Sequence, residues 1–120
     1  MKALFDTNIL IDYLSGRVAA RKTLASSRDA AISVITWTEV MVGAKDDGEA
    51  ARLKNFLLQW PVLDVNLRVA EQAAEFRRKT GVRVPDALIW ATAKCHDRVL
   101  LTRNTRDFKT GEFVRVPYRL

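Results

Sequence analysis

The segment that decides the fold is Lys2-Ala3-Leu4-Phe5-Asp6-Thr7-Asn8-Ile9-Leu10. A short apolar run ends at Phe5, and three polar residues follow it. Ile9, Leu10, Tyr13 and Leu14 then recur at helical spacing. We therefore predict a strand over residues 2–5, a turn over 6–8 and a helix directly behind it.

The rest of the chain repeats this alternation of strands and helices. Helices are predicted over 17–26, 36–42, 49–60, 67–80 and 87–93, and strands over 30–34, 62–65, 99–102 and 113–116, the last at a sheet edge. Residues 103–107 are expected to form a polar loop. Apolar strands that alternate with helices indicate a parallel sheet covered on both faces. No linker or repeat interrupts the pattern, so we expect a single domain over 1–120.

The composition is that of a folded globular domain with a basic surface. Hydrophobic residues make up 48% and charged residues 28%, which argues against disorder. The net charge is +6, and from Asp64 onward there are 12 basic against 7 acidic residues. Such an excess favours a polyanionic partner such as a nucleic acid, although surplus Lys and Arg also keep a protein soluble.

Cysteine use and hydropathy bear on where the protein works. The lone Cys95 has no second cysteine with which to form an internal disulfide, and Met1-Lys2 leads straight into the first strand without a secretory apolar region. No apolar stretch approaches the roughly 18 residues that cross a bilayer. We expect a cytoplasmic protein that does not enter the membrane.

Three acids lie at a strand end or a helix start, and each has a plain structural explanation. Asp6 could cap the first helix. Thr36-Trp37-Thr38-Glu39 has the pattern of a capping box. Asp86, behind Pro85, suits the start of a helix. The same residues would also converge on one edge of a parallel sheet, where ligands bind in this architecture.

Converging carboxylates point to a divalent cation. They repel one another and resist ionisation unless a cation neutralises them. Oxygen ligands suit Mg2+ or Mn2+, whereas zinc is disfavoured because Cys95 and His96 are the only Cys and His and are adjacent. Mg2+ is held by a few carboxylates together with substrate phosphates. An acidic pocket in a basic protein therefore suggests phosphodiester cleavage.

Four segments together resemble the PIN-domain ribonucleases that act as VapC-type toxins of type II toxin–antitoxin systems. They are 4–10, 36–40, 85–93 (Pro-Asp-Ala-Leu-Ile-Trp-Ala-Thr-Ala) and 101–108 (Leu-Thr-Arg-Asn-Thr-Arg-Asp-Phe). The resemblance implies a three-layer α/β/α sandwich with a mainly parallel central sheet of four or five strands. It also implies a Mg2+-dependent endoribonuclease, with Mn2+ as a substitute, that leaves 5'-phosphate ends.

By the same resemblance, Asp6, Glu39 and Asp86 would bind the metal, and Asn104 with Asp107 would complete the site. Thr7, Asn8 and Thr102 look like supporting polar residues, and a carboxylate such as Glu39 or Asp86, or hydroxide on the metal, would serve as general base. The candidates for guiding RNA phosphates are Arg77, Arg78, Lys79, Arg83, Arg103 and Arg106, which could equally be solvated surface charges.

The sequence departs from the family pattern at two positions. Asn104 stands where many relatives carry an acid, so it would supply a neutral carbonyl ligand, and Asp107 could compensate. Trp90 replaces a small residue one helical turn after Asp86, and it would either line the site or pack in the core.

The family implies partners and leaves two alternatives open. RNA is the expected substrate, and a cognate antitoxin and a homodimer are expected, with the helices at 17–26 and 49–60 as candidate interfaces. One alternative is a non-catalytic PIN-like module that binds RNA. The other is a phosphoacceptor receiver domain, which is disfavoured because Asp64 would lie inside the third strand rather than at its end.

Overall fold

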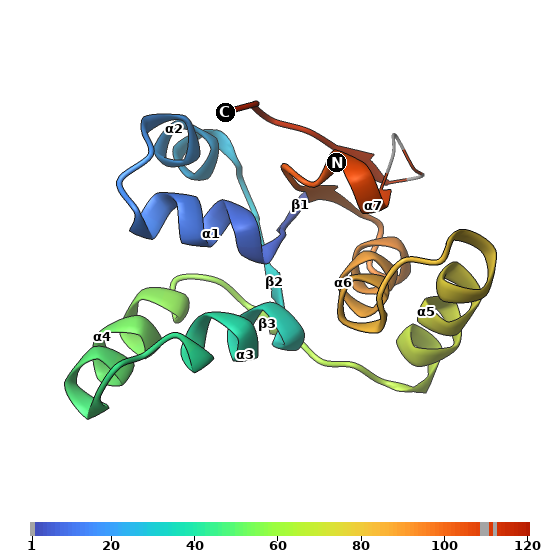
Figure 1. Cartoon of the computed structure of the whole chain (residues 1–120), viewed down its shortest axis with the longest axis horizontal. Coiled ribbons are helices and arrows are strands. Elements are labelled where there is room, and N and C mark those ends of the chain that lie inside the picture. The colour runs from blue at the N-terminus through green and yellow to red at the C-terminus, as the bar shows by residue number, and fades with distance from the viewer. Residues whose placement is uncertain (1, 109–110, 112) are drawn as a thin grey trace.

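The computed structural model describes residues 2–108, 111 and 113–120, and Figure 1 shows the arrangement of its elements. The strands are β1 (Lys2–Phe5), β2 (Ile32–Ser33), β3 (Val62–Leu63), β4 (Arg98–Leu101) and β5 (Val114–Arg115). The helices are α1 (Thr7–Leu14), α2 (Val18–Ser26), α3 (Val34–Val42), α4 (Asp47–Leu57), α5 (Leu67–Thr80), α6 (Val84–Cys95) and α7 (Thr105–Phe108).

The described strands pair in parallel throughout. One ladder has the order β1-β4-β5, and β2 pairs with β3 in a second ladder. A parallel bridge between Leu4 and Ala31 joins the two ladders, because Phe5 N–H donates to the Ala31 carbonyl and Ala31 N–H donates to the Ala3 carbonyl, both at 3.1 Å. The strand order across the molecule is therefore β3-β2-β1-β4-β5. The expected parallel central sheet is confirmed, but among the described residues its strands form a three-stranded and a two-stranded ladder linked by this bridge rather than one continuous sheet of four or five strands.

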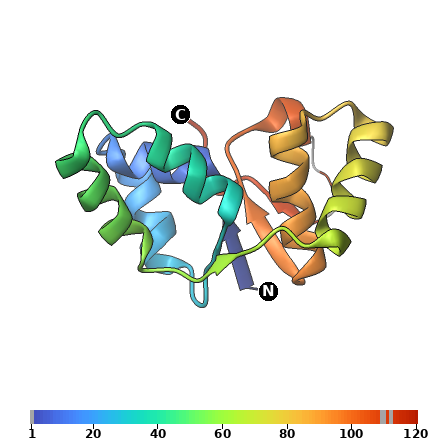
Figure 2. The same ribbon diagram turned by 90° about the horizontal axis from the view of Figure 1, so that it is seen from below.

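The two faces of the sheet carry separate hydrophobic cores. Along β1 successive side chains point to opposite faces. Leu4 packs with residues of α5 and α6, whereas Ala3 and Phe5 pack with residues of α1, α3 and α4. Figures 1 and 2 accordingly show α1–α4 on one side of the strands and α5 with α6 on the other. The predicted three-layer sandwich is confirmed.

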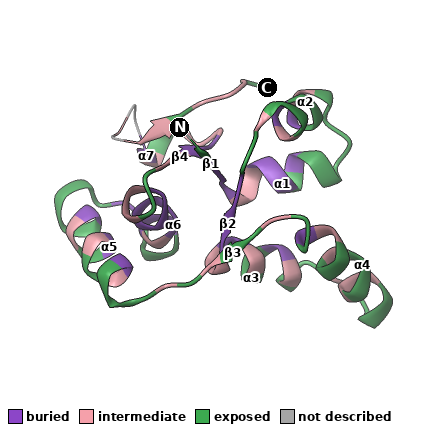
Figure 3. Cartoon of the chain, turned by 180° about the vertical axis from the view of Figure 1, so that it is seen from behind, coloured by how far each residue is buried: buried purple, intermediate pink, exposed green. Residues whose placement is uncertain are grey.

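Helix α6 is the most buried helix of the domain (Figure 3). Its Trp90 stacks face to face on Phe76 of α5, with ring centroids 3.8 Å apart, and meets Phe108 edge-on at 5.6 Å. Only 5% of Trp90 is exposed. The idea that Trp90 lines the acidic site is therefore wrong, because its ring fills the contact between α5, α6 and α7.

Several predicted boundaries are wrong by a few residues. The second strand ends at Ser33, whose hydroxyl accepts from Ile35 N–H and caps α3, so α3 begins two residues before Thr36. Helix α4 ends at Leu57, before Trp60, and α6 begins at Val84 rather than at Ala87. The third strand ends at Leu63, so Asp64 follows it instead of lying inside it.

The segment predicted as a polar loop contains α7 (Thr105–Phe108). Its short length hides it from periodicity arguments, because one turn of helix gives no repeat to detect. The final strand, β5, is confirmed as an edge strand that pairs with β4. Among the described residues, no helix has the length and apolar character needed to span a membrane.

Candidate active site

Asp6 occupies the junction between β1 and α1 and lies at the centre of a buried hydrogen-bond network. Its Oδ1 accepts from Thr7 N–H at 2.8 Å, which makes Asp6 the N-cap of α1. Its Oδ2 accepts from the Thr102 hydroxyl at 2.6 Å and from Asn8 Nδ2 at 3.1 Å. Thr102 directly follows β4, the strand next to β1. The capping explanation for Asp6 is thus correct, and it coexists with a position at the carboxyl ends of neighbouring strands.

Burial raises the pKa of Asp6 from its ordinary value of 3.8 to about 6. The hydrogen bonds from Thr102 and Thr7 oppose this shift, while the negative charges of Asp86 and Glu39 add to it. Only 3% of Asp6 is exposed. A carboxylate held in this way gains from any cation that reaches it.

Glu39 lies on α3 with its carboxylate directed toward α1. Thr7 Oγ1 donates to Glu39 Oε1 at 2.6 Å and lies 3.1 Å from Thr36 Oγ1. A hydroxyl carries a single proton, so Thr36 must donate across the second contact. The capping-box interpretation of Glu39 is wrong, because α3 is capped by Ser33 and Glu39 contacts another helix instead.

Asp86 lies in the first turn of α6, is buried, and is paired with Arg83. Arg83 Nε and Nη2 both donate to Asp86 Oδ2, at 3.3 and 3.2 Å. Burial raises the pKa of Asp86, the Arg83 charge and hydrogen bond lower it, and the charge of Asp107 raises it further. The side chain of Arg83 is 76% exposed, so water screens this ion pair and it is weak.

Asn104 has a structural task at the start of α7. Its carbonyl oxygen accepts from the N–H groups of Arg106 and Asp107, at 3.2 and 3.1 Å. Its amide donates to Asp107 Oδ2 at 2.8 Å, and its own N–H donates to Thr102 Oγ1 at 3.0 Å. The carbonyl that was expected to bind a metal is therefore engaged in capping a helix. Asn104 acts here mainly by fixing Asp107 and Thr102.

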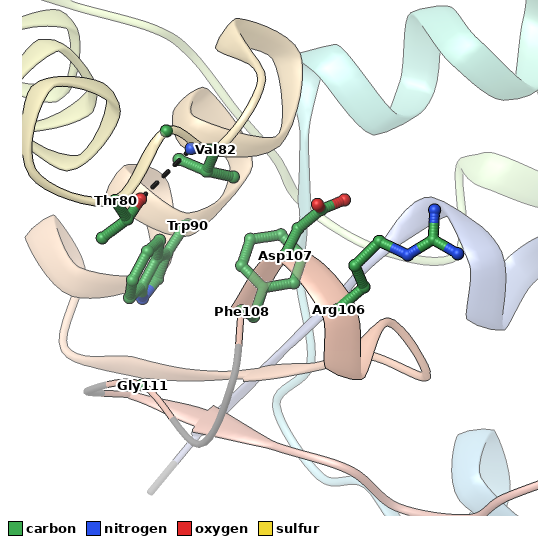
Figure 4. A pocket seen from close by; sticks show the side chains of 8 residues that line it. Thr80, Val82, Trp90, Arg106, Asp107, Phe108 and Gly111 are labelled. Carbon is green, nitrogen blue, oxygen red and sulfur yellow. Dashed lines mark hydrogen bonds between the residues drawn. The ribbon is translucent and has the colours of Figure 1, made fainter.

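Four of the five predicted site residues line one pocket of about 350 Å3. Asp6, Glu39, Asp86 and Asn104 share it with Thr7, Asn8, Ile11, Arg83 and Arg103; we call it the acidic pocket. Asp107 instead lines a neighbouring hollow of about 410 Å3 beside Trp90, shown in Figure 4, where the Arg106 and Asp107 side chains point away from the Trp90 ring. Asp107 is close enough to Asp86 to influence its pKa.

The basic candidates divide into two groups. Arg83 and Arg103 border the acidic pocket, and Arg106 borders the neighbouring hollow. Arg77 stabilises the C-terminal end of α5, because its Nη1 donates to the carbonyls of Gly81 and Val82. Lys79 pairs with Glu75 on the surface. The structural explanation therefore holds for Arg77 and Lys79, and only part of the basic cluster faces the site.

The sequence pattern of the PIN domain family matches residues 3–113 of the chain, which is most of its length. The chain belongs to the PIN domain family.

Two curated relatives of this PIN domain come from Mycobacterium tuberculosis. Ribonuclease VapC10 is 31% identical over 96% of the chain and 92% of its own length. Ribonuclease VapC19 is 32% identical over 96% of the chain and 98% of its own length. Among solved structures, a chain of a toxin–antitoxin complex from Klebsiella pneumoniae superposes with a TM-score of 0.92 at 43% identity, covering 99% of this chain and all of its own.

The oxygen donors of this PIN domain fit a hard divalent cation. Within the described ranges, no group of three Asp, Glu, His or Cys side chains is close enough to hold one ion jointly. Mg2+ keeps several of its waters and needs only one or two direct carboxylates. A pocket of about 350 Å3 edged by Asp6, Glu39 and Asp86 has room for such a hydrated ion. Burial is the main cause of the raised pKa of Asp6, and the negative charges of Asp86 and Glu39 add to it, so a cation bound beside Asp6 would favour its ionised form.

Sequence reasoning missed two polar residues of the PIN domain that bear on the site. Asp12 is 5% exposed and accepts from Arg103 and from the Tyr118 hydroxyl. The available signal was an acid inside an otherwise apolar run of helical residues. Tyr118 gave no signal at all, because its partner is 106 positions away in the sequence.

Proposed function

We propose that this PIN domain, over residues 1–120, is a metal-dependent endoribonuclease and the toxin of a toxin–antitoxin pair. The curated relatives that match nearly the whole chain are ribonucleases by name. The observation that carries the proposal is the convergence of Asp6, Glu39 and Asp86 on one pocket, although they come from three separate elements. Simple helix caps would not need to meet there.

PIN-domain ribonucleases depend on metal in general, and we assign Mg2+ to this one, with Mn2+ as a substitute. One or two of Asp6, Glu39 and Asp86 would hold it directly, and the rest would act through its waters. Bound there, the cation would polarise the phosphate and favour attack by water and departure of the 3'-oxygen. Products with 5'-phosphate ends are expected.

The protein's own residues orient the site and accept a proton from the attacking water. Thr102 and Asn8 fix Asp6 in one rotamer through hydrogen bonds of 2.6 and 3.1 Å. Glu39 is exposed and accepts a hydrogen bond from the neutral Thr7 hydroxyl, so its carboxylate is placed to take a proton from the attacking water. Arg83 and Arg103 supply positive charge at the edge of the pocket, which favours the approach of a polyanion.

The partners follow from the same relationships. The solved relative from Klebsiella pneumoniae is part of a toxin–antitoxin complex, and we propose that an antitoxin protein also covers this chain, with an Arg of its tail at the acidic pocket. We further propose a homodimer that acts on RNA in the cytoplasm, with α2 and α4 as candidate interface helices. Light scattering of the purified protein tests the dimer directly.

The test of the activity uses antitoxin-free protein and a labelled pool of cellular RNA, incubated with Mg2+, Mn2+ or EDTA. Asp6→Asn removes the central carboxylate while it keeps the side-chain shape. Asp64→Asn is the matched control, because Asp64 is an exposed acid that also follows a strand but lies outside the acidic pocket. We expect cleavage with either metal for wild type and Asp64→Asn only.

The outcomes separate this proposal from the non-catalytic alternative. Cleavage that persists in EDTA, or in Asp6→Asn, would contradict the assigned site. RNA that is bound but left uncut by wild type in both metals would favour an RNA-binding module. That alternative draws on one observation: Asn104 is neutral, so the site has one carboxylate fewer than the family pattern.

A further inference from the structure

The C-terminal segment crosses the molecule and ends against α1. After β5 the chain runs back toward α1 and α2, so that the C-terminus lies beside α2 in Figures 1 and 3. The Tyr118 hydroxyl donates to Asp12 Oδ2 at 2.7 Å. Asp12 lies on α1 two turns after Asp6, and 5% of it is exposed. This hydrogen bond links the C-terminal segment to α1, the helix that Asp6 caps.

Asp12 also accepts a bidentate pair of hydrogen bonds from the guanidinium group of Arg103. Arg103 Nε donates to Asp12 Oδ2 at 2.6 Å and Arg103 Nη2 donates to Oδ1 at 2.9 Å. Burial alone would raise the pKa of Asp12, but the hydrogen bonds from Arg103 and Tyr118 hold it below its usual value. Bidentate Arg–carboxylate pairs fix the orientation of the guanidinium plane. Arg103 is therefore held by Asp12 in one orientation.

The same contact joins the loop after β4 to the acidic pocket. Arg103 N–H donates to Asn8 Oδ1 at 3.1 Å, and the Asn8 amide donates to Asp6 and to Thr102. Arg103 itself is one of the residues that line the acidic pocket, and its side chain is 34% exposed. Asp12 takes two of the five guanidinium N–H donors, which leaves donors for a further acceptor.

We propose that Arg103 binds a phosphate of the RNA strand at the acidic pocket, and that Asp12 and Tyr118 are positioning residues that hold its guanidinium there. This rests on the proposed ribonuclease function and adds a substrate contact to it. An arginine whose one edge is anchored to a buried carboxylate loses little side-chain freedom when its other edge binds a phosphate oxygen. Arg83 lacks this anchoring, because its side chain is 76% exposed and its partner Asp86 belongs to the metal site.

The test measures binding of a fluorescein-labelled single-stranded RNA of mixed sequence by anisotropy, over a series of salt concentrations in Ca2+. A gel confirms that the RNA stays intact. Removal of one phosphate contact lowers the slope of log affinity against log salt by about 0.7 for single strands. For Arg103→Met we expect that loss of slope and a Kd raised about tenfold, as for a lost charged hydrogen bond. Arg68→Met, at an exposed arginine in the first turn of α5, is the matched control and should keep the wild-type slope.

A double-mutant cycle distinguishes positioning from general stabilisation. Tyr118→Phe removes only the hydroxyl, and we expect it to raise Kd about threefold when Arg103 is present, on the order of a partly lost hydrogen bond. In the Arg103→Met background it should have no further effect on Kd. Tyr13→Phe is the control for a tyrosine hydroxyl on α1 and should leave Kd unchanged, since the Tyr13 ring is partly exposed and stacks on Phe56 of α4.

Each result decides the proposal. An unchanged salt slope in Arg103→Met, or a Tyr118→Phe effect that persists without Arg103, would overturn it even if wild type cuts RNA normally. If Arg103→Met does not fold, Arg103→Gln takes its place, since its amide can still donate a hydrogen bond to Asp12 but carries no charge. An unchanged salt slope in that variant would equally overturn the proposal. Wild-type protein that neither binds nor cuts RNA would instead defeat the proposed function itself.

Discussion

At the scale of single residues, Asp6 carries both a structural and a chemical role, and the two make opposite demands. As the N-cap of α1 it stabilises the helix, yet burial near Asp86 and Glu39 makes its ionisation unfavourable. Its folded pKa of about 6 lies above the unfolded value. Ionisation therefore costs the folded state stability as pH rises from about 4 to about 6, and a bound cation would reverse this cost.

The prediction for Asp6→Asn follows because ionisation of Asp6 destabilises the folded state as pH rises. Without added metal, wild type should lose between about 1 and 3 kcal/mol of stability as pH rises from 4 to 7 relative to Asp6→Asn. Millimolar Mg2+ should raise the melting temperature of wild type at pH 7 and leave that of Asp6→Asn unchanged. Thermal unfolding at several pH values measures both effects. If the stabilities of the two proteins change with pH in parallel, folding does not raise the pKa of Asp6 and the prediction is wrong.

Asn104 is a second residue with a clear expectation. Replacement by Asp keeps an oxygen to cap α7 but turns the 2.8 Å contact with Asp107 Oδ2 into a contact between two carboxylates. Asn104→Asp should lower the stability at pH 7 by about 1 kcal/mol, and the loss should be smaller at pH 4, because protonation of either carboxylate removes the repulsion.

Asn66→Asp is the control for Asn104→Asp. Asn66 Oδ1 caps α5 through Val69 N–H at 2.9 Å, with no carboxylate recorded against it. Asp and Asn cap helices about equally well, so this substitution should be nearly neutral in denaturant unfolding at both pH values. A cost equal to that of Asn104→Asp would argue against repulsion at Asp107.

At the scale of elements, the packing of α7 against α6 depends on a glycine. A Cβ at Gly111 would lie 2.6 Å from Trp90 Cζ2 and 2.9 Å from the Phe108 carbonyl. Because Trp90 is held between Phe76 and Phe108, it has little room to move. Gly111→Ala should therefore cost about 1–3 kcal/mol by overpacking.

A second glycine provides the comparison for that substitution. Gly48, in the first turn of α4, has space for a methyl group, with its nearest neighbour at 3.4 Å on the Asp46 side chain. Gly48→Ala should be neutral or slightly stabilising, because alanine has the higher helix propensity. Urea unfolding of both variants measures the difference, and equal stabilities would disprove the overpacking argument.

At the scale of the whole molecule, Asp12 ties together α1, the loop after β4 and the C-terminal tail. Asp12→Asn should lower the free energy of unfolding by about 2 kcal/mol at pH 7, the value typical of hydrogen bonds to a charged group. The folded pKa of Asp12 lies below its usual value. Its stabilisation is therefore present above the unfolded pKa and is lost as pH falls through the folded pKa.

The measurement for Asp12 is the stability difference between wild type and Asp12→Asn as a function of pH. It should be full at pH 7 and should shrink at acid pH. Asp64→Asn, which changes an exposed acid, should show no difference at any pH. A gap between wild type and Asp12→Asn that does not depend on pH would mean that shape, rather than charge, stabilises this cluster.

Local sequence determined the alternation of strands and helices, the parallel sheet and three of the acids that meet at its edge. Hydrophobic periodicity and the chirality of parallel connections leave few other arrangements for such a chain. The helix boundaries were harder to predict from the sequence. Ser33 and Thr36 can both cap a helix, and in the structure it is Ser33, one turn earlier, that caps α3. The single turn of α7 lies below the length at which periodicity can be read.

Only the tertiary structure decided which polar side chains share a contact. Asp12 and Tyr118 are 106 residues apart, and Thr102 reaches Asp6 across 96. The sequence likewise could not decide that Asn104 caps α7, that Glu39 accepts from Thr7, or that Trp90 packs away from the acidic pocket. Each of these contacts depends on how side chains from separate helices and strands are oriented toward one another, and the hydrophobic pattern of the sequence does not specify that orientation. The sequence by itself determined the fold and the central acids, and the packing of the elements determined how those acids are held.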